Sequence, residues 1–300
     1  MLATPLLILA PPGAHAARLA AMLGQHPAAQ DLPELNLFLA PTLAGLSDIS
    51  ALADGRTAEG LLRAVAAVHF GAQRDATIVE ARRWLARRPD WTGAMTLDDF
   101  ARRFAPNLLV AADTSVAWRP DMLDRLLETV PDVRVLHLTE HPRSWCRDTA
   151  AALHDRLFIA PDYKDYEANP PALDPQVAWF RVHGNIARAM SGSSPSEYRL
   201  QRVEALLARP EATLASLCEW LGLSSGAAEI DAMQQPERSI FAGFGPNGAV
   251  YGADEGWLRD PAFARRLASG ERLEGPLEWR RDGKVFAPEL IALANMHGYH

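Results

Sequence analysis

Residues 6–38 read LLILAPPGAHAARLAAMLGQHPAAQDLPELNLF, and this stretch decides the fold class. Leu6 to Ala10 is a short, continuous apolar run, which is typical of a strand buried on both faces. A Pro-Pro-Gly turn ends the run, and the alanine- and leucine-rich segment from Ala16 to Gln25 then favours a helix. A buried strand, a tight turn and a helix in this order indicate the first unit of an α/β fold.

The same alternation continues along the chain. We expect further strands at 108–112, 133–138 and 198–203, and helices at 58–85, 120–129, 143–157, 210–221 and 287–296. Strands that alternate with helices predict a mainly parallel sheet covered on both faces. The glycine-rich segment 241–251 is predicted to be a loop. We interpret residues 1–300 as a single domain, with a core at 1–223 and a covering C-terminal loop and helix at 224–300.

The charge balance argues against two classes of partner. Acidic residues outnumber basic ones by 37 to 30, which gives a net charge of −7. Because nucleic acids and anionic membranes attract basic surfaces, we expect neither as a partner. No apolar run reaches the roughly 18–20 residues that span a bilayer. The two cysteines, Cys146 and Cys218, match no metal-ligand spacing, so we expect no metal and a reducing, cytoplasmic location.

Four segments together resemble one known family. They are residues 6–38, VRVLHLTEHPRSWCRD at 133–148, RVEALLARPEATLASLCEWLGL at 202–223, and the pair 244–261 and 273–299. Their order and spacing are similar to those of bacterial sulfotransferases that use the sulfonate donor PAPS. The resemblance covers nearly the whole chain. It implies a three-layer α/β sandwich related to P-loop nucleotide kinases.

The resemblance also implies a function. Members of the family move a sulfonate from PAPS to a hydroxyl or amine of a small molecule or glycan, release PAP, and need no metal. PAPS carries a 5′-phosphosulfate and a 3′-phosphate, so a protein that binds it needs helix-terminus amides at one end and fixed cations at both. Catalysis then depends on positioning, on charge stabilisation and on one general base.

The loop expected to hold the phosphosulfate departs from the family's pattern. Its matching positions are Pro12, Gly13, Ala14, His15, Ala16 and Ala17. The family's basic residue and all of its hydroxyls are missing from these positions, and His15 stands where the family has a small glycine. The backbone amides at the start of the following helix remain as candidate donor-binding groups.

Three further donor-site positions hold a carboxylate. At two of them the family has a cation, and at the third it has an uncharged serine. Asp113 stands where the family often has lysine, Glu140 replaces an arginine, and Asp148 replaces a serine. Carboxylates beside a phosphate are unfavourable, so the sequence predicts that PAPS binding is weakened or abolished. Arg143 and Arg147 are the nearest candidate cations.

Glu34 is the candidate general base. It occupies the position of a glutamate that has this role in several branches of the family, and its carboxylate suits proton transfer from a hydroxyl or amine. The alternative is a structural carboxylate in a helix cap or a buried ion pair. His15 is a second candidate base, although a lone loop histidine is more often solvated or packed.

The C-terminal third supplies the remaining candidates. Asn247, Tyr251 and Trp257 are candidate acceptor-binding residues, and Arg272 and Arg280 are candidate donor-site cations. The alternatives are a turn around Asn247 and ordinary surface arginines.

Three functions remain open from the sequence, as does whether the protein is an enzyme. The first is sulfonate transfer from PAPS with an eroded donor site. The second is a non-PAPS reaction on the same scaffold, for example on a carrier-protein or thioester-linked intermediate. The third is a non-catalytic binding protein. The sequence does not decide between a monomer and a homo-oligomer.

Overall fold

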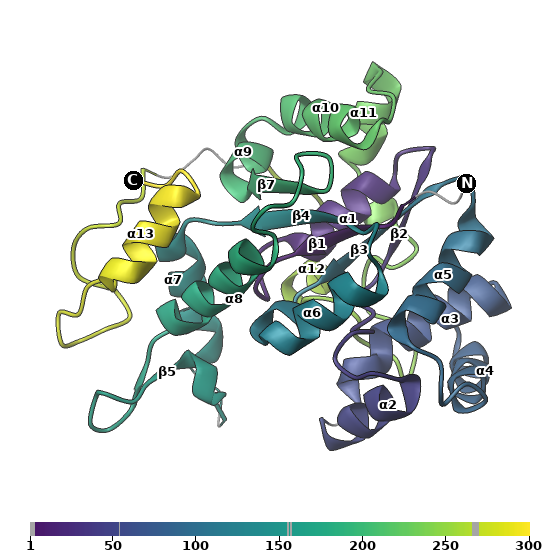
Figure 1. Cartoon of the computed structure of the whole chain (residues 1–300), viewed down its shortest axis with the longest axis horizontal. Helices are drawn as coiled ribbons and strands as arrows, with labels where there is room; N and C mark the ends of the chain where they lie inside the picture. The colour runs from purple at the N-terminus through teal and green to yellow at the C-terminus, as the bar shows by residue number, and fades with distance from the viewer. Residues whose placement is uncertain (1–3, 54, 155, 157, 266–269) are drawn as a thin grey trace.

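The computed structural model describes residues 4–53, 55–154, 156, 158–265 and 270–300, and its centre is a parallel sheet (Figure 1). The strand order is β2-β3-β1-β4-β7, and every neighbouring pair is parallel. The strands are β1 (Leu6–Leu9), β2 (Ala29–Leu32), β3 (Leu108–Asp113), β4 (Arg134–Thr139) and β7 (Tyr198–Arg202). This confirms the predicted α/β class, and it places β1 at the centre of the sheet.

The central strand is buried on both sides. Leu6 and Ile8 pack into the hydrophobic core on one face of the sheet, whereas Leu7 and Leu9 pack into the core on the other face. Successive side chains of a strand point to opposite faces, so a strand covered on both sides reads as an unbroken apolar run. The run in the sequence therefore reflects a sheet between two helical layers.

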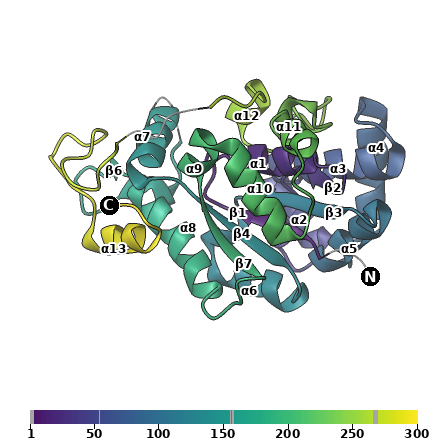
Figure 2. The same cartoon turned by 90° about the horizontal axis from the view of Figure 1, so that it is seen from above.

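Helices cover both faces, as Figures 1 and 2 show. The first face is covered by α1 (Ala16–Gly24), α7 (Pro142–Leu153), α9 (Val203–Ala208), α10 (Pro210–Leu221), α11 (Ala227–Met233), α12 (Glu255–Arg259) and α13 (Pro288–Met296). The second face is covered by α2 (Leu43–Leu52), α3 (Glu59–Phe70), α4 (Asp75–Ala86), α5 (Gly93–Phe104) and α6 (Pro120–Thr129). Helix α8 (Gln176–Ala189) contributes to both cores.

The prediction of a single helix at 58–85 was wrong. The structure divides it into α3 and α4 at Gly71, whose φ of 75° lies in the left-handed region. A glycine in this conformation commonly ends a helix, because other residues are strained there. The predicted helix at 143–157 begins at Pro142 and ends at Leu153; Leu157 lies outside the described residues.

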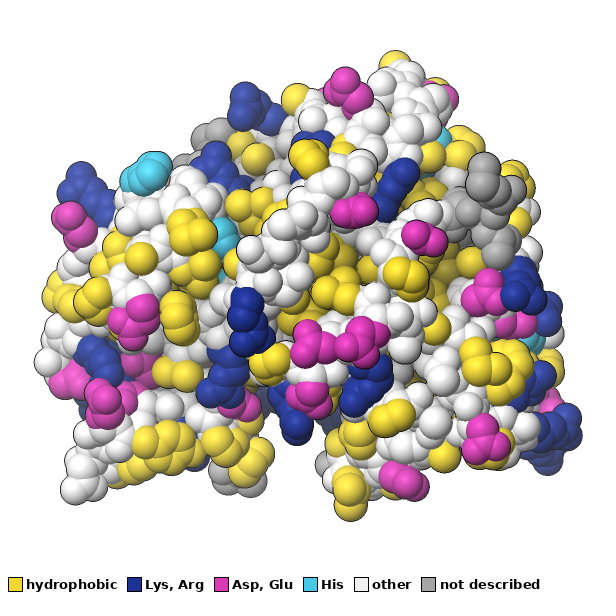
Figure 3. Space-filling view, in the orientation of Figure 1, with side chains coloured by type: hydrophobic (Ala, Val, Ile, Leu, Met, Phe, Trp, Pro, Cys, Tyr) yellow, Lys and Arg dark blue, Asp and Glu magenta, His cyan; other side chains and the backbone are white. Residues whose placement is uncertain are grey.

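The structure contains elements that the sequence reasoning did not predict. The short strand β2 and the helices α2, α5 and α8 are the main ones, together with the hairpin of β5 (Lys164–Asp165) and β6 (Ala172–Leu173). None of the described helices is both long and apolar enough to cross a membrane. On the face shown in Figure 3, side chains of both charges are interspersed rather than separated by sign.

Candidate functional site

The first turn lies between β1 and α1, at the carboxyl edge of the central strand. Gly13 and His15 both have a positive φ, of 80° and 61°. Trp145 on α7 supports the turn, because its Nε1 donates to the carbonyl of Pro12 at 2.9 Å. In open parallel sheets, ligands bind at this edge, so the turn is the natural centre of a site.

Two cavities meet at the first turn. One has a volume of about 420 Å³ and the other about 280 Å³, and both are lined by Gly13, His15, Asp148 and Asp254. Ala16 and Ala17 line the smaller cavity, and Pro12 lines the larger one. The structure therefore brings these predicted loop positions together around one hollow.

Glu34 lines the smaller cavity. Burial and the nearby carboxylates of Asp113 and Asp254 together raise the pKa of its carboxyl group to about 8, although a hydrogen bond from Thr114 acts in the opposite direction. The Thr114 hydroxyl donates to Oε2 of Glu34 at 3.1 Å. Glu34 is thus predominantly protonated at pH 7, and its pKa lies close to the pH at which proton transfer is efficient.

Asp113, one of the predicted donor-site positions, has a structural role. Its Oδ1 accepts hydrogen bonds from the backbone amides of Ser115 at 2.9 Å and Val116 at 2.8 Å, at the end of β3. Burial raises the pKa of its carboxyl group. The side chain therefore shapes the turn after β3, and it leaves no cation at this position.

The two cavities are richer in carboxylates than in cations. Four carboxylates line one or both of them, in addition to Glu34: Glu140, Asp148, Asp254 and Asp260. The lining arginines are Arg18 and Arg156. With Glu34 protonated, the described lining residues carry an excess of two negative charges at neutral pH, apart from any charge on His15.

Arg143 is turned away from a phosphate-binding role by its own contacts. Its Nε donates to the carbonyl of Arg272 at 2.7 Å, and its Nη1 donates to the carbonyl of Pro276 at 2.9 Å. Nη1 also contacts Oε1 of Glu278 at 2.8 Å. Nη2 donates to the carbonyls of Glu274 and Gly275 at 2.8 and 3.1 Å. A guanidinium has five N–H groups, and all five are matched by acceptors of the C-terminal segment.

The other predicted donor-site arginines are likewise engaged or exposed. Arg147 pairs through Nη1 with Glu271 at 2.7 Å, and through Nε with Asp148 at 3.5 Å. Arg272 has an exposed side chain and lines neither cavity at the first turn.

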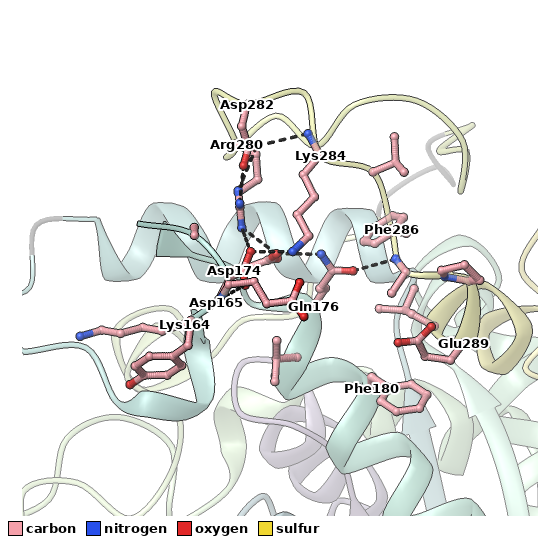
Figure 4. Close-up of a pocket in the computed structure, with 18 of the residues that line it drawn as sticks. Lys164, Asp165, Asp174, Gln176, Phe180, Arg280, Asp282, Lys284, Phe286 and Glu289 are labelled. Carbon is pink, nitrogen blue, oxygen red and sulfur yellow. Dashed lines mark hydrogen bonds and ion pairs between the residues drawn. The ribbon is translucent and has the colours of Figure 1, made fainter. Parts of the chain in front are cut away.

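Arg280 lies in a separate pocket, where Figure 4 shows its contacts with neighbouring carboxylates. It lines a separate cavity of about 860 Å³, which none of the first-turn residues lines. There its Nη1 contacts Asp165 at 2.9 Å and Asp174 at 3.0 Å, and its Nη2 contacts Asp282 at 2.5 Å. Lys284 joins the same network through Asp165. The structure therefore separates Arg280 from the predicted donor loop.

No protein-family model matches the sequence, and no curated protein matches it. Solved structures do match. The sulfotransferase domain of the Synechococcus PCC 7002 olefin synthase has a TM-score of 0.72 and 20% identity, over 99% of this chain and 95% of that one. The sulfotransferase domain from the curacin biosynthetic pathway has a TM-score of 0.72 and 19% identity, over 100% and 99%. This chain has the sulfotransferase fold.

Of the predicted acceptor-binding residues, only Trp257 is found at the hollow of this sulfotransferase fold. Trp257 is buried and lines the smaller cavity. Its Nε1 is buried without a hydrogen-bond partner among the described residues. Tyr251 instead packs beneath the guanidinium of Arg56, at 4.6 Å, and Asn247 is exposed and bonds to Asp75 at 3.1 Å.

Sequence reasoning missed several residues of the site. Thr114 directly follows β3, and a polar residue at the carboxyl end of a predicted strand was a usable signal. Asp254 caps the N-terminus of α12 by accepting a hydrogen bond from the amide of Trp257, three residues later, at 3.1 Å. Aspartate is a favoured residue at this position, so it was a usable signal for the start of a helix. Two aromatic residues that line the larger cavity had no sequence signal: Tyr163 ends a short 3-10 helix (Pro161–Tyr163), and Phe158 lies on an irregular segment.

Three histidines form a cluster of the kind that can bind a metal ion. The ligand atoms of His137, His183 and His297 lie within 4.8 Å of one another, and all three side chains are buried. Nε2 of His137 and Nδ1 of His183 are 2.7 Å apart, which is a hydrogen-bond distance. Two nitrogens on one tetrahedral zinc would be about 3.3 Å apart. The observed geometry is therefore an imidazole hydrogen bond, and a metal would require the rings to separate.

Proposed function

We propose that this protein is an enzyme on the sulfotransferase fold that does not use PAPS. Its active site is the hollow at the first turn, where Glu34 exchanges a proton with a hydroxyl or amine of a small-molecule or carrier-bound substrate. The observation that carries the proposal is the charge of this hollow, with four carboxylates against two arginines.

Electrostatics supports the exclusion of PAPS. The donor has two separate anionic ends, and each needs cations or several N–H groups. Arg143 gives all five of its N–H groups to the C-terminal segment, and Arg280 lines a different cavity. Carboxylates at 140 and 148 repel a phosphate by about 1 kcal/mol or more each. Binding of a doubly anionic nucleotide would require several of these side chains to rearrange.

Proton transfer is the chemistry that the hollow supports best. The pKa of Glu34 is raised to about 8, so a modest change in its surroundings switches the carboxyl group between acid and base. Thr114 holds Oε2 in place at the wall of the smaller cavity. When ionised, Glu34 would accept a proton from a hydroxyl or amine of the substrate and become the neutral acid, which can return the proton in a later step.

Sulfonate transfer from PAPS is the second candidate. It is favoured by the fold, because the matched sulfotransferase domains align with this chain over nearly their whole length. It would require Arg18 or Arg156 to replace the missing donor-site cations.

Thermal unfolding with PAP separates the two candidates. A ligand at a hundredfold excess over its Kd stabilises a protein by about 2.7 kcal/mol. We expect no shift for the natural protein. Any stabilisation by PAP should be larger for the double variant Glu140→Arg/Asp148→Ser, which restores the family's residues at these two positions. A clear shift for the natural protein would overturn the proposal in favour of sulfonate transfer.

A further inference from the structure

We infer that His137, His183 and His297 form an acid-sensitive latch, which holds the C-terminal tail (residues 288–300) against the protein at neutral pH and releases it in mild acid. The three histidines line neither cavity at the first turn, so this role is independent of the proposed function. Three features support it: the elements that the histidines join, their hydrogen bonds and the weak attachment of the tail.

The three histidines come from three separate elements. His137 lies in β4, His183 lies in α8, and His297 directly follows α13. All three side chains are buried, and the centroids of their rings are 5.0, 5.0 and 5.5 Å apart. The cluster is therefore the place where the C-terminal tail meets the sheet and α8.

The hydrogen bonds of the cluster leave no place for additional protons. Nε2 of His137 and Nδ1 of His183 are 2.7 Å apart, so one proton lies between them. Nδ1 of His137 contacts the hydroxyl of Tyr198 at 2.9 Å, and Nε2 of His183 has no partner among the described residues. Full protonation of both rings would make two N–H groups face each other. A charge on His297 as well would place three cations side by side in the interior, which is strongly unfavourable.

The surroundings do not compensate positive charge on the rings. Burial and the other rings of the cluster lower the pKa values of His137 and His183, and burial lowers that of His297 to about 4; no carboxylate of the described residues is among these influences. The other titratable or charged groups that contact or act on the cluster and residues 298–299 are Tyr198 and Arg202 of β7, Glu204 of α9, Glu140 after β4 and His141 before α7. The two carboxylates act on Tyr299 rather than on the histidines.

The tail is the element that is free to leave. Helix α13 packs mainly against α8 and lies at the edge of the molecule, as Figures 1 and 2 show. Beyond α13, Arg202 donates to the carbonyl of Gly298 at 2.8 Å, and the hydroxyl of Tyr299 donates to Glu204 at 3.0 Å. None of these contacts belongs to the central sheet, so the sheet can stay intact when the tail opens.

The start of the tail is a natural hinge. The amide of Ala287 donates to the buried side chain of Gln176 at 2.9 Å, which fixes the chain just before α13. Leu290 and Ala294 of α13 are buried, so apolar contacts keep the tail closed while the histidines are neutral. Residues 288–290 line the cavity of about 860 Å³, and release of the tail would remove this wall.

Mild acid favours the open tail through all three histidines. An exposed imidazole has a pKa of about 6.5, and the closed cluster keeps its rings neutral below this pH. Each histidine that binds a proton only in the open state favours opening by about 25-fold between pH 7 and pH 5, and the three factors multiply.

Hydrogen–deuterium exchange of the full chain, measured by mass spectrometry at pH 7 and pH 5, tests the latch. After correction for the intrinsic exchange rates, the protection of residues 288–300 should be lower than that of β1 and β3 at both pH values, because the tail opens before the sheet. It should also fall by more than about 25-fold between pH 7 and pH 5, which is the effect of a single histidine.

Three variants separate the latch from general loosening of the tail. His297→Gln should reduce the effect of pH on tail protection by about 25-fold. His300→Gln is the matched control in the same tail, because its side chain is exposed, and it should leave the effect of pH unchanged. Tyr299→Phe removes the hydrogen bond to Glu204 and should lower tail protection by the same factor at both pH values. Circular dichroism at pH 7 checks that each variant is folded.

Three results would overturn the inference. The first is tail protection as strong as that of β1 and β3, because the tail would then open only when the whole protein unfolds. The second is a fall in tail protection of less than about 25-fold between pH 7 and pH 5. The third is an unchanged effect of pH in His297→Gln. If this variant does not fold, the first two measurements on the natural protein decide.

Discussion

The hydroxyl of Thr114 donates to Oε2 of Glu34 at 3.1 Å, beside the carboxyl end of the central sheet. This bond favours the ionised carboxylate, but burial and the carboxylates of Asp113 and Asp254 outweigh it, so the pKa of Glu34 is raised to about 8. A proton therefore stays on Glu34 at a pH where an exposed glutamate has lost it. This relationship has a measurable consequence for stability.

The stability of the Glu34→Gln variant, relative to that of the natural protein, should increase as the pH rises. Between pH 4.5 and about 8, the folded protein holds a proton on Glu34 that the unfolded chain has released, so the stability of the natural protein falls as the pH rises through this window. Glutamine does not titrate. The free energy of unfolding, measured with urea from pH 5 to 9, should therefore shift in favour of the variant at high pH. Parallel pH profiles for the two proteins would contradict the raised pKa. Glu80→Gln, at a residue of α4 whose side chain is 42% exposed, is the control.

Arg143→Met should destabilise the protein by about 3 kcal/mol or more. The substitution leaves several carbonyl oxygens of the segment 272–276 without their donor. Arg147→Met is the matched control on the same helix, because it removes a pair whose arginine is 44% exposed, which is expected to cost about 0–1 kcal/mol. Denaturant unfolding measures both values. Equal effects would show that Arg143 does not anchor the C-terminal segment.

Acid should destabilise the protein through the buried histidine cluster. Burial lowers the pKa values of His137 and His183 well below 6.5, and that of His297 to about 4. The unfolded chain binds protons on these residues below about pH 6.5 while the folded protein does not, so stability is lost as the pH falls through this value. His297→Gln should reduce the pH dependence of the unfolding free energy, between pH 4.5 and 6, by about one proton. His300→Gln, at an exposed position, should leave it unchanged. If the unfolding free energy of His297→Gln changed with pH as steeply as that of the natural protein, His297 would not be neutral and buried in the folded state.

The left-handed backbone of His15 predicts a difference between two substitutions. With φ at 61°, a residue with a Cβ is strained and glycine is not. His15→Gly and His15→Ala both remove the imidazole and its contact with Arg18 at 3.1 Å. We expect the alanine variant to be less stable than the glycine variant by about 1 kcal/mol, in urea unfolding. Equal stabilities would mean that the turn relaxes to a different conformation.

The sequence was most informative where local pattern sets the structure. The apolar run of β1, the turn after it and α1 were predicted closely, because burial on both faces and a Pro-Gly turn leave a plain local signal. The helix Pro120–Thr129 was predicted to the residue, since proline begins it and its apolar face is regular. The break at Gly71 was missed, because apolar residues continue on both sides of it.

The positions of the charged side chains could not be predicted from the sequence. The acceptors of Arg143 lie about 130 residues later in the chain, and those of Arg280 include Asp165, more than 100 residues earlier. Such pairings depend on how the C-terminal segment packs, for which the sequence has no local signal. The carboxylates at 113, 140 and 148 were readable, because residue types are read directly from the sequence.

The fully occupied guanidinium of Arg143 has a consequence for how this scaffold could change. The oxygens at 272–278 occupy the N–H groups of Arg143, so a phosphate could bind this guanidinium only by displacing them. A nucleotide would have to compete with these oxygen atoms, which belong to the same chain and therefore stay close to the guanidinium. Gaining donor binding through this arginine would therefore begin with loosening the tail of the chain, and only then with remodelling the first turn.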